Sequence, residues 1–304
     1  MRAFIWLLRR EVWEHKGLWI APAVTIGVIL ISALWGSIAM IGSEDAMARI
    51  DADMGNILDG ETRALVYITS LTVAAVVAMV MLVVLFFYLL DALYAERRDR
   101  SILFWRALPV SDLRTVLSKL AVALLLVPAL TLAAVIVYLL LHHVLLGTVL
   151  VLGTDLSFGQ FTSLGAVFAS LITVGSLLLY VGIWYLPFYG WLLLVSAWAR
   201  RAPFLWAVLL PAGIMLFERI ALQSRHFADL LGGHLAAAFD YSATDWSDGA
   251  RNTLITEEGL TETLATWPVW LDGLSRPGMW LGLAIGMVFV AGAVAIRRYR
   301  GETA

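Results

Sequence analysis

The sequence predicts an all-α protein that crosses a membrane several times, and three observations support this fold class. Of the 304 residues, 61% are hydrophobic and only 14% are charged, a composition outside the usual range of soluble domains. The apolar residues gather in runs of about 20 or more, the length that a helix needs to cross the hydrocarbon layer. These runs lack strong period-two alternation, which favours helices over the strands of a membrane barrel.

Six stretches meet the length requirement for a membrane-spanning helix. We therefore treat residues 1–304 as a single transmembrane domain. The six expected spans are residues 18–41, 64–90, 120–146, 161–185, 203–223 and 278–296.

The charges between the spans predict the orientation of the chain. With the N-terminus inside, fifteen of the 21 Lys and Arg residues fall in cytoplasmic segments, and sixteen of the 23 acidic residues fall on the other side. Cytoplasmic segments of membrane proteins are enriched in Lys and Arg. We therefore expect a multi-pass protein of the bacterial inner membrane with both termini in the cytoplasm.

The first seventeen residues form an amphipathic segment. Trp6 and Trp13 within it and Trp19 just after it suit the headgroup region, and its basic residues suit anionic lipid. We expect residues 1–17 to form an interfacial helix that contacts lipid and a cytoplasmic partner; a plain anchor for the first span is the alternative. The residues that define its two sides are Phe4, Ile5, Leu8 and Val12 on one arc, with Arg10 and Glu14 on another.

A charged insert, residues 91–119, separates the second span from the third. Its first part reads as a continuation of the second span out of the membrane, and Ser111 is a plausible cap for a new helix. Apolar residues within it, notably Phe104 and Trp105, favour contact with a protein groove or a lipid surface. We interpret the insert as a docking element; a basic loop that only fixes topology is the alternative.

Two later regions depart from a simple series of spans. Residues 161–199 are too long for one span and too short for two, and Pro187 disfavours helix just before it. We expect a span that ends near Tyr185 and a short helix at the inner interface; one long kinked helix is the alternative. The segment 224–277 is long for a loop, and we expect short helices at the outer face, anchored by tryptophan.

The stretch Glu96–Asp112, with Leu117-Ser-Lys-Leu120 after it, resembles the permease subunits of type-2 ATP-binding cassette (ABC) exporters. The N-terminal helix, the six spans and the long segment before the sixth span extend the resemblance over nearly the whole chain. In that family the insert is a coupling helix in a groove of a separate ATPase subunit. The residues to which the resemblance gives this role are Glu96, Arg97, Arg98, Asp99, Arg100, Phe104, Trp105, Arg106, Leu108, Pro109 and Ser111.

The resemblance also implies how the work is divided between subunits. The sequence has no glycine-rich loop that ends in Gly-Lys-Ser/Thr, so ATP and its magnesium ion are expected on the partner ATPase, in two copies. Two copies of this chain would line the pathway. The cargo is expected to be a small molecule, a lipid-like compound or a peptide, and no catalytic residue, cofactor site or metal site is predicted on this chain.

Other polar and small residues offer weaker signals. A glycine stripe, Gly278, Gly282 and Gly286, is typical of close helix packing, although membrane glycines are also common without it. The pair Glu218 and Arg219 is expected to snorkel or to form a mutual network. The four histidines that could meet on the outer face are His142, His143, His226 and His234; hydrogen bonding at the interface is the simpler interpretation.

Three other function classes remain as alternatives to an exporter subunit. An ion-driven transporter would need ionisable residues in mid-membrane or inverted repeats, and neither stands out. A non-transporting scaffold would need no such features. An intramembrane enzyme ranks last, because the spans contain scattered Ser and Thr but no buried His or paired acids, and the chain has no Cys.

Overall fold

The computed structural model confirms an all-α fold. It describes residues 2–41, 59–99, 111–153, 164–247 and 274–300. In chain order the elements are α1 (Arg2–Glu14), α2 (Gly17–Ile41), α4 (Asp59–Ala92), α5 (Tyr94–Arg98), α7 (Asp112–Ala121), η1 (Val122–Leu126), α8 (Val127–Gly153), α9 (Leu164–Trp184), α10 (Leu186–Trp198), α11 (Pro203–Phe217), η3 (Glu218–Leu222), α12 (His226–Ser247) and α16 (Pro277–Arg300).

Six helical stretches are long and apolar enough to cross a membrane, as the sequence predicts. They match the six expected spans in order, with boundaries that shift by up to eight residues. By length and composition these stretches are Gly17–Ala39, Ile68–Arg98, Asp112–Leu145, Val167–Trp184, Pro203–Leu222 and Pro277–Tyr299.

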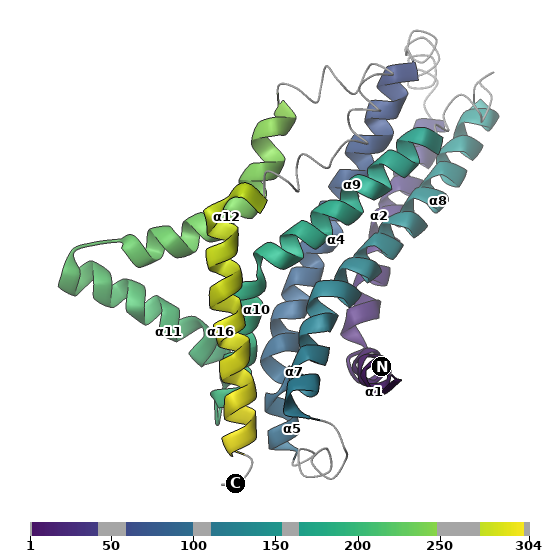
Figure 1. The fold of residues 1–304 in the computed structure, drawn as a ribbon. Helices are drawn as coiled ribbons and strands as arrows, with labels where there is room; N and C mark the ends of the chain where they lie inside the picture. The colour runs from purple at the N-terminus through teal and green to yellow at the C-terminus, as the bar shows by residue number, and fades with distance from the viewer. Residues whose placement is uncertain (1, 42–58, 100–110, 154–163, 248–273, 301–304) are drawn as a thin grey trace.

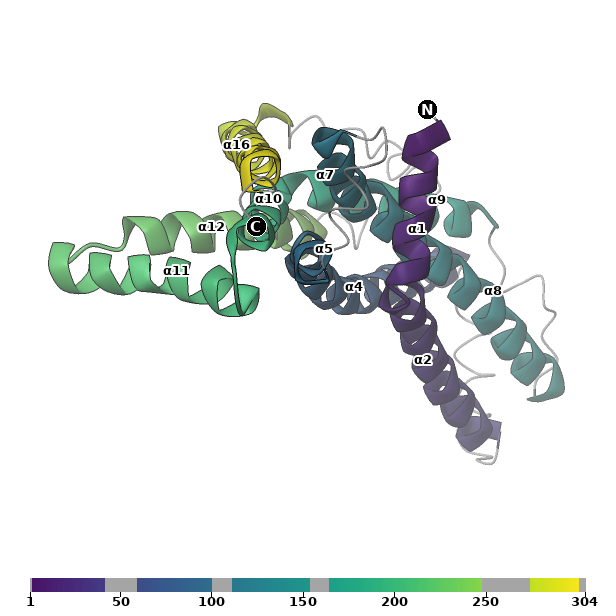
Figure 2. The same cartoon turned by 90° about the horizontal axis from the view of Figure 1, so that it is seen from below.

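The elements form a bundle with a projecting arm (Figure 1). Helices α2, α4, α8 and α9 run side by side, α10 and α16 pack against them, and both chain termini lie at the same end, here called the terminal end. Helix α1 lies across this end and is seen lengthwise in Figure 2. Helices α11 and α12 extend together away from the bundle in both views. We call α11, η3 and α12 the arm.

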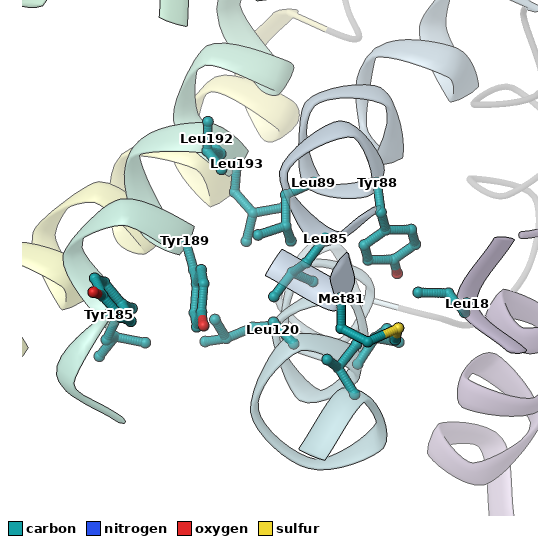
Figure 3. Close-up of a cluster of buried hydrophobic side chains, with 14 of the residues drawn as sticks. Leu18, Met81, Leu85, Tyr88, Leu89, Leu120, Tyr185, Tyr189, Leu192 and Leu193 are labelled. Atoms are coloured by element: carbon teal, nitrogen blue, oxygen red, sulfur yellow. The ribbon is translucent and has the colours of Figure 1, made fainter. Parts of the chain in front are cut away.

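The core of the bundle is built around α4. Residues Met81, Leu85 and Leu89 recur every four positions, so they share one face of the helix, and each is at most 1% exposed. Figure 3 shows them meeting Leu18 of α2 and Leu193 of α10. The second span therefore lies at the centre of the bundle.

Helices α9 and α10 are separated at Tyr185, which confirms a break there over the single kinked helix. Tyr185 has φ −83° and ψ 8°, and Pro187 falls in the first turn of α10, where proline is tolerated. The short helix expected after this break is α10, and it packs inside the bundle. Eight of its thirteen residues are buried, because apolar residues surround the helix on all sides and pack against α4 and α16.

Glycine allows α10 and α16 to pack closely. A Cβ atom on Gly190 would lie 2.7 Å from the carbonyl oxygen of Gly286, and one on Gly286 would lie 2.8 Å from the side chain of Leu186. The stripe in the sixth span thus serves close packing at Gly282 and Gly286. At Gly278 an added Cβ would make ordinary contact with Trp184.

The described part of the segment before the sixth span also differs from expectation. In place of short helices it holds α12, one helix of 22 residues, because the mostly apolar run after Phe227 continues helical through Gly232 and Gly233. Trp246 lies in α12, whereas Trp267 and Trp270 fall outside the described residues. The arm turns at Gln223, which takes a left-handed conformation with φ 51°.

Candidate functional site

Four buried charged side chains meet at the terminal end, each from a different helix. They are Glu11 of α1, Glu96 of α5, Lys119 of α7 and Arg297 of α16, and none is more than 5% exposed. Lys119 Nζ lies 3.0 Å from Glu11 Oε1 and 3.1 Å from Glu96 Oε1. Arg297 Nη1 donates to Glu96 Oε2 at 2.5 Å. We call these four residues the charge network.

Three further side chains border the network. The hydroxyl of Tyr88 donates to Glu11 Oε2 at 2.8 Å, which ties the network to the central helix α4. Arg297 Nε donates to Asp112 Oδ1 at 2.9 Å. His15 Nε2 lies 3.8 Å from Glu11 Oε2, and its ring is edge-on to Tyr88 at 4.7 Å between centroids. Burial lowers the pKa of its imidazole, although Glu11 opposes that shift.

Helical periodicity brings these residues to the interior. In α16, Val290, Ala293 and Arg297 lie three and four positions apart, so they share one face, and all three are buried. In α1, Leu7 and Glu11 are four positions apart and both buried. Each charge therefore extends an apolar face that already packs on the bundle.

The network balances two carboxylates against two cations. Each buried ion loses several kcal/mol of hydration, and pairing has to offset that cost. Loss of one partner leaves an uncompensated charge and destabilises a protein by about 3–5 kcal/mol. The arrangement therefore imposes a strong penalty on any movement that separates the four helices.

The network holds the two parts of the insert that flank segment 99–111. Glu96 precedes the segment 99–111, Asp112 follows it, and Arg297 binds both carboxylates. Ser111 caps α7, because its Oγ accepts from the backbone nitrogen of Arg114 at 3.4 Å and its backbone is extended. The segment thus starts and ends at one cation of the last helix.

A second set of contacts ties the start of the insert to α10. Ser196 Oγ accepts from the backbone nitrogens of Leu93 and Tyr94, each at 3.0 Å, at the break between α4 and α5. Arg97 Nη2 donates to the carbonyl oxygens of Ser196 at 2.5 Å and of Ala199 at 2.8 Å. A cation at the carbonyl end of α10 also complements the helix dipole.

The structure divides the predicted coupling residues into two groups. Glu96 and Arg97 make internal contacts, whereas Arg98 and Asp99 are exposed and pair with each other at 3.0 Å between Nε and Oδ1. Ser111 is the cap of α7. The predicted residues that lie outside the described part of the chain are Arg100, Phe104, Trp105, Arg106, Leu108 and Pro109.

The structure describes both predicted sides of α1. On the apolar arc, Phe4, Leu8 and Val12 are half-buried and Ile5 is 63% exposed, and on the other side Arg10 pairs with Glu14 at 2.6 Å between Nε and Oε1. The side turned to the bundle holds Glu11.

Sequence reasoning missed Glu11, Lys119 and Arg297 as partners. It counted Lys119 and Arg297 with the cytoplasmic charges that set topology. A signal was present, since Glu11 stands four residues after Leu7 and Arg297 four after Ala293, both on apolar faces. The pairing itself joins residues up to 201 positions apart and needs the fold.

The polar residues of the other end make local contacts. His143 Nδ1 lies 2.7 Å from the carbonyl oxygen of Leu139, and His142 stacks on Tyr138. His234 Nε2 lies 3.0 Å from the carbonyl oxygen of Trp184. Within the described ranges, no group of three or more His, Asp or Glu side chains is placed to hold a metal ion.

Glu218 stabilises the turn of the arm and does not pair with Arg219. Its Oε1 accepts from the hydroxyl of Ser224 at 2.8 Å, and its Oε2 accepts from the backbone nitrogen of Phe227 at 2.9 Å. The carboxylate thereby satisfies a free N–H group in the first turn of α12. The buried acid has a structural role here.

A large apolar groove lies between the arm and the α10–α16 pair. Its volume is about 1140 Å³, and aromatic side chains such as Trp184, Phe188, Trp191 and Phe289 line it. Such a surface can accommodate an apolar molecule, and Asp229, His234 and Arg276 are the ionisable side chains in its lining.

Comparison of the chain with known proteins found no relative: no protein-family model, no curated protein and no solved structure matches it.

Proposed function

We propose that the chain is the membrane-spanning permease subunit of an ATP-driven exporter of the ABC class. Two copies would line the pathway, and a separate ATPase subunit would dock on the insert 91–119 and carry the ATP and magnesium. The observation that carries the proposal is the set of buried ion pairs that hold the insert, here called its mounting. Arg297 binds Glu96 and Asp112, which flank segment 99–111 of the insert, and Lys119 ties Glu96 to Glu11 of α1.

This mounting suits the transmission of force. A docked ATPase would push on segment 99–111, and the buried contacts would carry the displacement to α1, α4, α7 and α16 together, since each is joined to the network or continuous with it. A freely hinged loop would absorb the displacement. ATP binding on the partner would thereby favour one of two arrangements of the spans.

The continuity of α7 with the third span strengthens this path. Helix α7 begins at Asp112 and runs through η1 into α8, so the exit of the insert is the start of a membrane-spanning helix. The η1 segment, Val122–Leu126, is a single π-helical turn of the kind found inside α-helices at functional positions. Rotation of α7 would reach the membrane interior through this turn.

The charge pattern supports a cytoplasmic position of the terminal end under this proposal. Both termini lie at the same end of the bundle, as an even number of spans requires (Figure 1). The Lys and Arg excess is on that side. The cytoplasm is also where an ATPase partner would find nucleotide.

An ion-driven transporter receives less support. Its proton or ion carriers would be carboxylates near the centre of the membrane. The buried carboxylates Glu11 and Glu96 lie instead at the terminal end, each within 3.1 Å of the Lys119 ammonium. Paired in this way, they suit a structural joint.

A photocrosslinking experiment tests the proposal. The chain has no cysteine, so Trp105→Cys gives one attachment point for a photoreactive thiol reagent in membranes of the native host. Illumination is expected to join the chain to a protein with a glycine-rich nucleotide-binding loop, identified by mass spectrometry. Trp280→Cys, an exposed position at the other end of α16, is the matched control and is expected to give no such product.

The proposal also requires that the captured ATPase depend on the mounting. Arg297→Met is expected to lower its yield at Trp105→Cys, while Arg298→Met, the neighbouring residue outside the network, leaves it unchanged. Labelling of Trp105→Cys from outside the cell, or capture of proteins without a nucleotide-binding loop only, would contradict the proposed function.

A further inference from the structure

The face of α1 turned away from the bundle carries aromatic and basic side chains. Ile5, Trp6 and Trp13 are 63%, 64% and 69% exposed. Arg9 lies between the two indoles, with Cζ 5.4 Å from the Trp6 ring centroid and 5.3 Å from the Trp13 ring centroid. Cation–π contacts with both rings hold the guanidinium in a defined place at the surface.

The exposed charges of this face are positive. Arg9 and Lys16 are exposed, and neither forms an ion pair within the part of the chain that the structure describes. The acids of α1 are engaged elsewhere, because Glu11 is buried in the charge network and Glu14 binds Arg10. We call Ile5, Trp6, Arg9, Trp13 and Lys16 the cationic face.

The cationic face continues into the first span. A shallow crevice of about 480 Å³ lies among Val12, Trp13, Lys16 and Trp19, where α1 meets α2. From the crevice an exposed apolar stripe follows α2 at helical spacing. Its residues are Ile20, Val24, Val28 and Ile31, with exposed fractions from 40% to 69%.

We propose that the cationic face docks on anionic phospholipid in the bilayer surface. Headgroup phosphates lie at Arg9 of α1 and at Lys16 in the turn that follows α1, the indoles lie at headgroup depth, and acyl chains follow the stripe on α2. Charge complementarity favours an anionic surface over a zwitterionic one. The apolar stripe distinguishes a lipid from a free phosphate ion, which would leave it uncovered.

Lipid binding on this face bears on the charge network. Helix α1 presents Glu11 to Lys119 on one side and Arg9 to the lipid on the other. Anionic lipid therefore holds α1 in the rotation that keeps Glu11 in the network. This inference goes beyond the proposed function and stands whether or not an ATPase drives the chain.

The test is a lipid titration of the full-length chain in detergent. Ile5→Cys, the single cysteine, carries an environment-sensitive dye on the cationic face. Short-chain phosphatidylglycerol is expected to shift the dye emission at a much lower concentration than short-chain phosphatidylcholine. Arg9→Gln or Lys16→Gln is expected to raise the half-saturating phosphatidylglycerol concentration about fivefold each.

The control is Arg98→Gln, an exposed cation at the same end but on α5, which is expected to leave the titration unchanged. Equal half-saturation by the two lipids would overturn the proposal. The same holds if the double variant Arg9→Gln/Lys16→Gln titrates like the parent chain. Inorganic phosphate that reproduces the full response would reveal a free-anion site and likewise overturn it.

Discussion

The terminal end and the arm handle buried charge in opposite ways. At the terminal end, four charged side chains from four helices pair across the bundle, with partners 108 and 201 residues apart in the chain. In the arm, Glu218 binds Ser224 and the backbone of Phe227, both within nine residues. Long-range pairs fix helices relative to one another, whereas local ones fix a turn.

Their apolar surfaces differ as well. In α10 most side chains are buried, whereas α11 buries only Ala207 and exposes Phe204, Leu209 and Phe217. An apolar helix exposed on most sides is suited to lipid or to another protein surface. The comparison teaches that the terminal end keeps its helices in fixed relative positions, whereas the arm exposes an apolar surface to lipid or to another protein.

Removal of one network cation should produce the largest effect. Lys119→Met leaves Glu11 and Glu96 without their shared ammonium, so unfolding free energy in detergent should fall by about 3–5 kcal/mol. Lys16→Met, an exposed cation at the same end, should change it by less than about 0.5 kcal/mol. Equal losses in the two variants would show that the network contributes no specific stability.

Glycine-to-alanine substitutions should change the stability in opposite directions in the bundle and in the arm. In Gly190→Ala the new Cβ meets the carbonyl oxygen of Gly286, so α10 and α16 must move apart, at a cost of about 1–3 kcal/mol. Gly213 of the arm has no neighbour within 4 Å of the same position, so Gly213→Ala should stabilise α11 by up to about 1 kcal/mol. Thermal unfolding of both variants measures this, and shifts in the same direction would contradict the close packing.

Loss of the Ser196 hydroxyl should have an intermediate effect. Ser196→Ala leaves the backbone nitrogens of Leu93 and Tyr94 without their acceptor, and the unfolding free energy should fall by about 1–3 kcal/mol. Ser32→Ala removes only a bond to its own helix and should cost a few tenths of a kcal/mol. If hydrogen exchange at Leu93 and Tyr94 stays as slow in Ser196→Ala as in the parent chain, the α4–α10 contact is not formed.

The smallest expected effect is a pH dependence at His15. Burial lowers the pKa of this imidazole, so the folded chain binds the proton less readily than the unfolded chain. Its contribution to stability is therefore complete above the unfolded pKa of about 6.5 and is lost as the pH falls through the lower folded value. Glu11, Glu14, Asp91 and Lys119 are the charges that act on it.

The measurement is the difference in melting temperature between the parent chain and His15→Gln across acidic and neutral pH. The parent chain should lose more stability than the variant as the pH falls. A melting-temperature difference that stays constant from neutral to acidic pH would mean that His15 does not titrate in this pH range.

The sequence was sufficient for features that depend on composition and local pattern. Length and hydropathy predict the six spans, Pro187 marks the break after Tyr185, and Ser111 is recognisable as a helix cap. These features follow from the need of every backbone N–H and C=O group in a helix, and above all in a membrane, to form a hydrogen bond. They require no knowledge of which helix lies beside which.

The candidate site depended on that knowledge. Lys119 and Arg297 are typical flanking charges of a span, and nothing near them in the chain indicates that both bind Glu96. The burial of α10 follows from packing against α16, which is about 90 residues away in sequence. Long-range contacts of this kind are set by the fold, so local pattern could not predict them.

A double-mutant cycle between Glu96 and Arg297 tests the central claim most directly. Unfolding free energies of Glu96→Gln, Arg297→Met, the double variant and the parent chain give the coupling between the start of the insert and the last helix. We predict a coupling of about 1.5 kcal/mol or more, since the pair is buried and in direct contact. Losses that add within about 0.5 kcal/mol would contradict a network that fixes the insert to α16.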